Sequence, residues 1–202
     1  MIFDNEHIYH VFNQGNKRGK VFFSRENYFF FLRKIKIHVS PFADILAWCL
    51  MPSHFHLMIY VKAAEISHPS VSAKNITLNN SIGNMLSSYT RAVNNEKNLS
   101  GSLFRQKTKA FCLNRIDEVT KAWYTSQGGT AINIQVPEKQ YPNVCYNYIL
   151  SNPVKSGLVK NRVEWEFSSY LDIEGLRKGK LLAYERIKSL GLVVNRGEAG
   201  LA

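Results

Sequence analysis

Two histidines separated by one residue, His54 and His56, are the side chains best placed to do chemistry together. The run from 54 to 60 alternates in character with the period of a β-strand, so both imidazoles face the same side. Two imidazoles one pleat apart can reach a single metal ion. The odd-numbered positions from Phe55 to Val61 are all apolar and predict contact with a core. By itself, the pair is equally typical of an ordinary solvated strand face.

A tyrosine and an asparagine about a hundred residues later form a second candidate group. The stretch 144–152 predicts a short helix that ends at Pro153, because the residue before a proline is driven out of the helical conformation. Tyr148 and Asn152 are four residues apart and therefore share a face of this helix. Tyr146 points to the other side and is assigned to packing. A phenol, an amide and a histidine pair would together make a recognisable catalytic set.

The order and spacing of several segments resemble the single-tyrosine HUH transposases, and within them the branch of REP-associated tyrosine transposases. The resemblance covers about residues 7–172. The segments that carry it are 9–18, 21–23, 27–32, 50–57, 101–106, 152–159 and 165–170. The stretch from about 123 to 141 is longer and more polar than is usual in that family.

The resemblance implies a ferredoxin-like α+β fold, with an antiparallel sheet and helices packed on one face. It also implies a metal-dependent DNA nickase and strand transferase, in which Tyr148 attacks a phosphodiester and leaves a 5′-phosphotyrosine and a free 3′-hydroxyl. His54 and His56, with Asn152 as a third ligand, would hold one Mg²⁺ or Mn²⁺ ion over the scissile phosphate. Ligand softness alone would favour zinc, copper, nickel or iron for imidazoles, so Mg²⁺ or Mn²⁺ is an expectation from the resemblance.

The charge of the chain agrees with a polyanionic partner. Lys and Arg number 26 against 15 Asp and Glu, which gives a formal net charge of +11 and a pI of about 9.6. Nucleic acid and an anionic membrane surface would both suit such a charge. No apolar run approaches the roughly 18 residues of a membrane span and no signal peptide opens the chain, so we expect no membrane partner. The three cysteines stand singly without CxxC spacing, which favours a cytoplasmic protein without disulfides or structural zinc.

Two polar and basic clusters are candidate contacts to DNA phosphates and base edges. Each is equally compatible with an ordinary solvated surface. We expect His10, in the opening segment, to be a structural histidine and no third ligand. The predicted DNA-binding residues are Asn16, Lys17 and Arg18 in the first cluster, and Arg105, Gln106, Lys107 and Lys109 in the second.

The coarse pattern of elements predicts one catalytic domain over residues 1–172 and a C-terminal helical appendage and tail over 173–202. Strands are expected at 7–14, 21–23, 43–51, 54–62 and 108–113. Helices are expected at 26–39, where Pro41 follows, at 76–95 and at 174–189. The polar stretch 63–74 is predicted to be a loop.

Two other functions remain open at this point. A domesticated relative could bind structured single-stranded DNA without cleaving it. A metal-dependent phosphoesterase could use water in place of tyrosine, although this leaves the spacing of Tyr148 and Asn152 unexplained. The expected partner is single-stranded or hairpin DNA, and the sequence is compatible with both a homodimer and a monomer.

Overall fold

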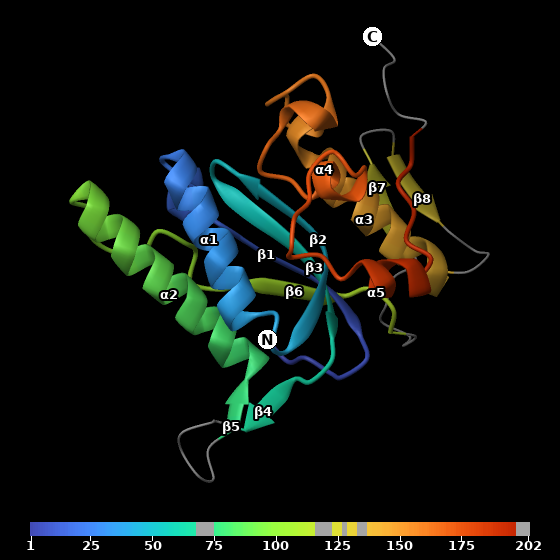
Figure 1. The fold of residues 1–202 in the computed structure, drawn as a ribbon, viewed down its shortest axis with the longest axis horizontal. Helices are drawn as coiled ribbons and strands as arrows, with labels where there is room; N and C mark the ends of the chain where they lie inside the picture. Colours follow the sequence, from blue (N-terminus) through green and yellow to red (C-terminus); the bar gives the residue numbers. More distant parts are fainter. Residues whose placement is uncertain (68–74, 116–122, 127–128, 133–136, 197–202) are drawn as a thin grey trace.

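The computed structural model describes residues 1–67, 75–115, 123–126, 129–132 and 137–196. Its main elements are β1 (Ile8–Gln14), α1 (Arg25–His38), β2 (Ala43–Met51), β3 (His54–Val61), α2 (Leu78–Lys97) and β6 (Lys109–Cys112). The four strands form one antiparallel sheet in the order β2-β3-β1-β6. This βαββαβ chain order and strand order define a ferredoxin-like arrangement, and the predicted α+β class is confirmed (Figure 1).

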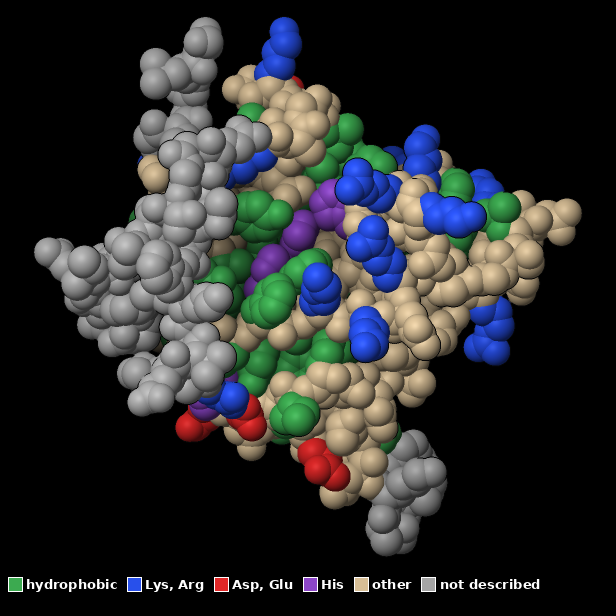
Figure 2. Space-filling model, turned by 180° about the vertical axis from the view of Figure 1, so that it is seen from behind, with side chains coloured by type: hydrophobic (Ala, Val, Ile, Leu, Met, Phe, Trp, Pro, Cys, Tyr) green, Lys and Arg blue, Asp and Glu red, His purple; other side chains and the backbone are tan. Residues whose placement is uncertain are grey.

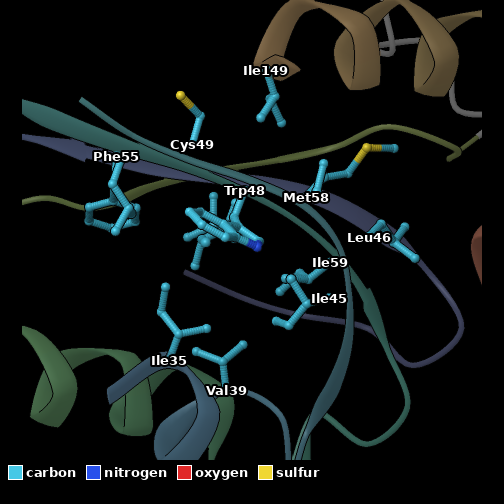
Figure 3. Packing of buried hydrophobic residues seen from close by; sticks show 14 of the residues in the cluster. Ile35, Val39, Ile45, Leu46, Trp48, Cys49, Phe55, Met58, Ile59 and Ile149 are labelled. Carbon is cyan, nitrogen blue, oxygen red and sulfur yellow. The ribbon is translucent and has the colours of Figure 1, made fainter. Parts of the chain in front are cut away.

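The two crossover helices lie side by side on one face of the sheet, and a third long helix, α3 (Pro137–Lys155), crosses the other face (Figure 1). On the first face, Phe55 points toward α1 and its ring lies 5.1 Å from that of Phe31. Figure 3 shows Phe55 and Ile35 on this side and Cys49 with Ile149 of α3 on the other. Both faces of β3 are therefore covered, which explains why most of its residues are buried.

The crossover helices form where their apolar stripes and end residues predict. In α1, Tyr28, Phe31 and Ile35 are buried at helical spacing. The helix begins where the Asn27 side chain accepts the backbone N–H groups of Phe23 and Ser24, and it ends at His38, shortly before Pro41. In α2 the Thr77 hydroxyl caps the first turn by accepting the Asn80 N–H. Both predicted helices are confirmed within a few residues.

The expected end of the tyrosine helix at Pro153 is wrong. α3 continues to Lys155 with Pro153 inside it. A proline removes one intrahelical hydrogen bond, and here the ring is buried while the helix adds little more than half a turn after it. The chain then leaves the helix at Gly157, whose φ of +70° is a left-handed conformation that glycine adopts readily.

Two other elements differ from the expectation. Residues 21–23 form no strand: the N–H groups of Val21 and Phe22 both donate to the carbonyl of Pro52, and both side chains are buried in the core. Of the helix expected at 174–189, only the end is helical, as α5 (Tyr184–Ser189), while the short α4 (Tyr170–Ile173) ends just before that span. Between them Ala183 donates to the Ile45 carbonyl, so this segment binds the edge of β2 instead of coiling.

A partly buried ion pair joins α4 to the segment that follows it. Asp172 accepts two hydrogen bonds from Arg177, whose guanidinium also donates to the carbonyls of Glu166 and Ser168. Gly179 packs so closely that a Cβ there would lie 2.5 Å from the Asp172 carboxylate. The boundary between residues 172 and 173 stays a prediction, and the segment on its C-terminal side contacts β2.

The remaining elements are short. They are the 3-10 helices η1 (Asn16–Arg18) and η2 (Arg162–Glu164), the hairpin strands β4 (Glu65–Ser67) and β5 (Asn75–Thr77), and the pair β7 (Trp123–Ser126) and β8 (Gly129–Ile132). The predicted loop at 63–74 thus contains β4, and residues 68–74 of it lie outside the described part. Within the described residues, none of the helices has the length and apolar character needed to cross a bilayer.

Candidate active site

The face of the sheet beneath α3 carries three histidines from two adjacent strands, and we call it the histidine face. His54 and His56 lie on it through the alternation of β3, as predicted. In the antiparallel register Phe12 of β1 lies opposite His56, and His10 is two residues away on the same face. The strand pairing therefore adds a third imidazole to the pair recognised in the sequence.

The two predicted metal ligands have different surroundings. His56 is buried, and its Nδ1 lies 2.8 Å from Nε2 of His10. Its own Nε2 is buried and has no hydrogen-bond partner among the described residues. His54 is half-buried, with Nδ1 3.1 Å from the Ser53 hydroxyl and Nε2 3.2 Å from Oδ1 of Asn152. The structure thus brings Asn152 next to His54, and the resemblance grouped these two residues as ligands.

Helix α3 places Tyr148 above these histidines. The Tyr148 ring lies edge-on to His56 with centroids 5.5 Å apart, and 38% of the residue is exposed. Tyr146, two residues earlier, is completely buried. This confirms that the two tyrosines face opposite sides of the helix. Lys155, at the end of α3, lies with its Nζ 5.9 Å from the centre of the Tyr148 ring.

Tyr148, His54 and His56 border a pocket of about 240 Å³. Three cations of the second predicted cluster, Arg105, Lys107 and Lys109, line the same pocket, and Phe12, Asn13 and Gln14 of β1 complete it. Figure 2 shows this side of the molecule, where histidine side chains form a row at the surface and several Lys and Arg side chains lie beside it. The pocket therefore combines a phenol and imidazoles with a basic rim.

The other predicted DNA-binding residues lie elsewhere. Asn16 donates to the carbonyl of Ser102, while Lys17 and Arg18 are exposed with left-handed backbone angles, and none of the three lines the pocket. Gln106 lines a second, larger groove of about 700 Å³ between α2 and the segment that leads to β6. Arg105 lines both hollows, so they are neighbours on the surface.

Burial favours the neutral forms of the three histidines and of Tyr148. It lowers the pKa of His10 to about 4 and the pKa of His54, and it places the pKa of His56 well below its ordinary value. Burial also raises the pKa of Tyr148, and the Asn152 side chain works against that rise. Neutral imidazoles are the form that can ligate a metal, whereas the phenol needs help to ionise.

The residues fit a weakly held divalent ion. His56 offers a buried Nε2 without a partner in the described part of the chain. Nε2 of His54 donates to Oδ1 of Asn152 at 3.2 Å, so these two atoms lie close enough together to serve one ion once the imidazole proton is on the other ring nitrogen. Among the described residues, His, Cys, Asp and Glu side chains form no group of three or more that could hold a metal. Two imidazoles and one amide would leave positions open for phosphate and water.

Sequence patterns did not identify every residue of the site. His10 was expected to be structural, and its contact with His56 is compatible with that expectation but was not anticipated. Phe12 and Lys155 were not singled out, because their place near Tyr148 depends on strand register and on the length of α3. The alternation of the first strand, which puts His10, Phe12 and Gln14 on one side, is the signal that could have grouped them.

Comparison with known proteins supports the fold. The structure is similar to that of a REP-associated tyrosine transposase bound to a REP hairpin, with a TM-score of 0.53 and 15% sequence identity. The similarity covers 99% of this chain and 91% of that protein. No model of a known protein family matches the sequence, and no curated protein is similar to it at a significant level. At this identity the likeness shows a common fold.

Proposed function

We propose that this protein is a metal-dependent DNA nickase and strand transferase that acts on single-stranded or hairpin DNA through a 5′-phosphotyrosine. The observation that carries the proposal is the position of Tyr148. It lies partly exposed against His56, one helical turn from Asn152, in a pocket rimmed by Arg105 and Lys109. The fold shared with a transposase that binds a DNA hairpin supports the same proposal.

Tyr148 would be the nucleophile of a transesterification. Its Oη forms a bond to phosphorus as the bond from phosphorus to the 3′ oxygen breaks. The phenol loses its proton, and the departing 3′ oxygen gains one, which leaves a 5′-phosphotyrosine and a 3′-hydroxyl. Because the phosphodiester is exchanged and not hydrolysed, a second 3′-hydroxyl can attack the phosphotyrosine and restore a DNA bond. This reversibility would make the protein a strand transferase.

His54, His56 and Asn152 would hold the divalent ion, which we expect to be Mg²⁺ or Mn²⁺. When bound, such an ion supplies Lewis-acid stabilisation of the phosphate oxygens. Burial in the histidine face lowers the pKa of both imidazoles and so favours their neutral form. Asn152 is buried in the turn of α3 that follows Tyr148, so one helix would position the nucleophile and a ligand together.

The basic rim would bind the DNA backbone. Arg105, Lys107 and Lys109 surround the pocket and can neutralise phosphates on either side of the scissile bond. The neighbouring groove along α2 has Arg91, Asn94 and Gln106 in its wall. Since Arg105 borders both hollows, a strand that leaves the pocket can continue into this groove.

A cleavage assay tests the proposal. The protein is incubated with a labelled library of single-stranded hairpins and Mn²⁺ or Mg²⁺, and denaturing gels are examined for a covalent protein–DNA adduct. Mass spectrometry after nuclease trimming should place the nucleotide on Tyr148. Binding without an adduct would support the relative that only binds DNA. Cleavage that leaves a free 5′-phosphate would support the phosphoesterase that uses water.

A further inference from the structure

His10 and His56 form a buried pair beneath Tyr148. Their rings stack with centroids 5.0 Å apart, and Nε2 of His10 lies 2.8 Å from Nδ1 of His56. Only 8% of His10 and 5% of His56 are exposed. A contact this short between two imidazole nitrogens is a hydrogen bond, so one nitrogen carries a proton and the other presents a lone pair.

The surroundings of His10 hold its ring in place. Phe12 stacks on it with centroids 4.8 Å apart, and Tyr148 lies edge-on at 6.1 Å. In the sheet register Met58 of β3 and Phe111 of β6 lie on either side of His10. These contacts leave the imidazole little freedom to turn away from His56.

The two possible directions of the hydrogen bond differ in what they leave on the other nitrogen of His56. If His10 donates, a neutral His56 carries its proton on Nε2. If His56 donates from Nδ1, its Nε2 is a lone pair. This Nε2 is buried and has no partner in the described part of the chain. Buried N–H groups without an acceptor are rare because they forfeit a hydrogen bond, so the second arrangement is favoured.

We propose that His10 is a positioning residue, whose Nε2 accepts the Nδ1 proton of His56 and thereby holds His56 in the tautomer with an unprotonated Nε2. Histidines that ligate metals commonly donate their second ring N–H to a fixed acceptor, which orients the ring. His10 would supply that acceptor in the form of a neutral imidazole. The consequence for metal binding rests on the proposed function, whereas the tautomer is a property of the protein alone.

The tautomer can be measured directly in metal-free wild-type protein. Two-bond proton–nitrogen spectra of ¹⁵N-labelled protein distinguish protonated from unprotonated ring nitrogens, and a His56→Asn variant assigns the signals. The expected result is a proton on Nδ1 of His56 and none on Nε2. A proton on Nε2 would overturn the inference, whatever the variants show.

Two substitutions then test the role of His10. His10→Phe keeps an aromatic ring in the stack but removes the acceptor, so we expect a mixture of His56 tautomers and an affinity for Mn²⁺ reduced about 10- to 100-fold. His10→Gln keeps an acceptor oxygen and should retain the wild-type tautomer and most of the affinity. His7→Phe, a histidine substitution outside the site, is the control for both.

The outcomes separate this inference from the proposed function. In one outcome no DNA yields an adduct, but His56 carries its proton on Nδ1 and the His10→Phe variant shows a mixture of His56 tautomers. The proposed function then fails and the positioning role stands. If adducts form while His10→Phe changes neither the tautomer nor the Mn²⁺ affinity, the positioning role fails and the function stands. Circular dichroism shows whether each variant folds, and the wild-type spectrum decides the tautomer even if a His10 variant does not fold.

Discussion

At the scale of single residues, two tyrosines of one helix are distinguished by their environments. Tyr146 is fully buried and its hydroxyl has no partner among the described residues, whereas Tyr148 borders the pocket beside His56. A nucleophile must reach its substrate, and a buried phenol cannot. The structure therefore strengthens the choice of Tyr148 that spacing alone suggested.

Tyr148→Phe is expected to reduce formation of the covalent DNA adduct by more than about 1,000-fold, because the nucleophile is removed while the ring remains. Tyr146→Phe is the matched control. It removes a buried hydroxyl that has no partner among the described residues, so cleavage and thermal stability should stay close to wild type. Adduct yield on denaturing gels checks both. An adduct that persists in Tyr148→Phe, or that maps to Tyr146, contradicts the assignment.

His54→Ala and His56→Ala should each lower cleavage at least about 100-fold and change DNA affinity by less than about threefold, because dispersed cations provide most of that affinity. Cleavage and gel-shift measurements on the same samples test this. His7→Ala, outside the site, controls for removal of an imidazole. Since His56 is buried, a melting curve must accompany that variant to show that it folds. Unimpaired cutting by either variant would remove the metal-site assignment.

Local spacing could predict the site only where its residues share an element. His54 and His56 are one pleat apart, and Tyr148 and Asn152 are one helical turn apart, so each pair is visible in the sequence. The partnership of His10 with His56 depends on how β1 and β3 align. Nothing local to residue 10 specifies that register.

At the scale of elements, the segment between α2 and β6 positions the basic rim. The backbone N–H of Arg105 donates to the Gln14 carbonyl. Asn13 in turn donates to the Arg105 carbonyl and the Thr108 hydroxyl. These bonds join the segment to the end of β1, next to the histidine face. The cations at 105, 107 and 109 reach the pocket for this reason, whereas Lys17 and Arg18 do not line it.

Neutralising Arg105, Lys107 or Lys109 to Gln should weaken DNA binding and lower the slope of log affinity against log salt. The expected decrease is about 0.7 for each phosphate of a single strand that the protein no longer neutralises. Lys17→Gln and Arg18→Gln, of equal charge change outside the pocket, should have smaller effects. Fluorescence anisotropy at several salt concentrations measures the slopes. Equal slopes for both groups of variants would show that a cation's position around the pocket has no influence on DNA binding.

The predicted elements are correct where a long periodic stripe of apolar residues determines the local structure. They are wrong where a tertiary contact determines it. Tyr28, Phe31 and Ile35 mark α1 because burial repeats along one face. The apolar residues near Leu182 suggested a helix too, but they contact the edge of β2 and the chain turns around the Asp172–Arg177 pair. The strand expected at 21–23 is instead a core segment bonded to Pro52.

At the scale of the whole molecule, the complete set of candidate groups comes from one chain. Tyr148 lies against His56 of the same molecule, and Asn152 contacts His54. The sequence is compatible with both a homodimer and a monomer. From this placement we expect a site that one chain can complete by itself.

Mixing Tyr148→Phe protein with His56→Ala protein should therefore restore no cleavage, because each molecule lacks one essential group of its own site. The two variants are combined at equal concentration and after joint refolding, and adduct formation is compared with each alone. Wild-type protein diluted with either variant provides the reference for activity. Recovery of a substantial part of the wild-type activity would mean that sites form between two chains.

The pocket has no carboxylate among its lining residues: its floor is neutral and its rim is cationic. The cationic rim would repel a divalent ion in the absence of a phosphate, and a bound ion would attract the phosphate. Metal and DNA should consequently bind with positive cooperativity, each raising the affinity of the other by the same factor. We expect this factor to be about 10 or more. Titrations of the Tyr148→Phe variant with Mn²⁺, with and without an oligonucleotide, measure it. Equal Mn²⁺ affinities in the two titrations would exclude the coupling. The free protein would then carry little metal. Bound DNA would supply further ligands to the ion, so the ion would bind stably only together with the substrate. Without DNA, the protein would have little bound metal and no activity.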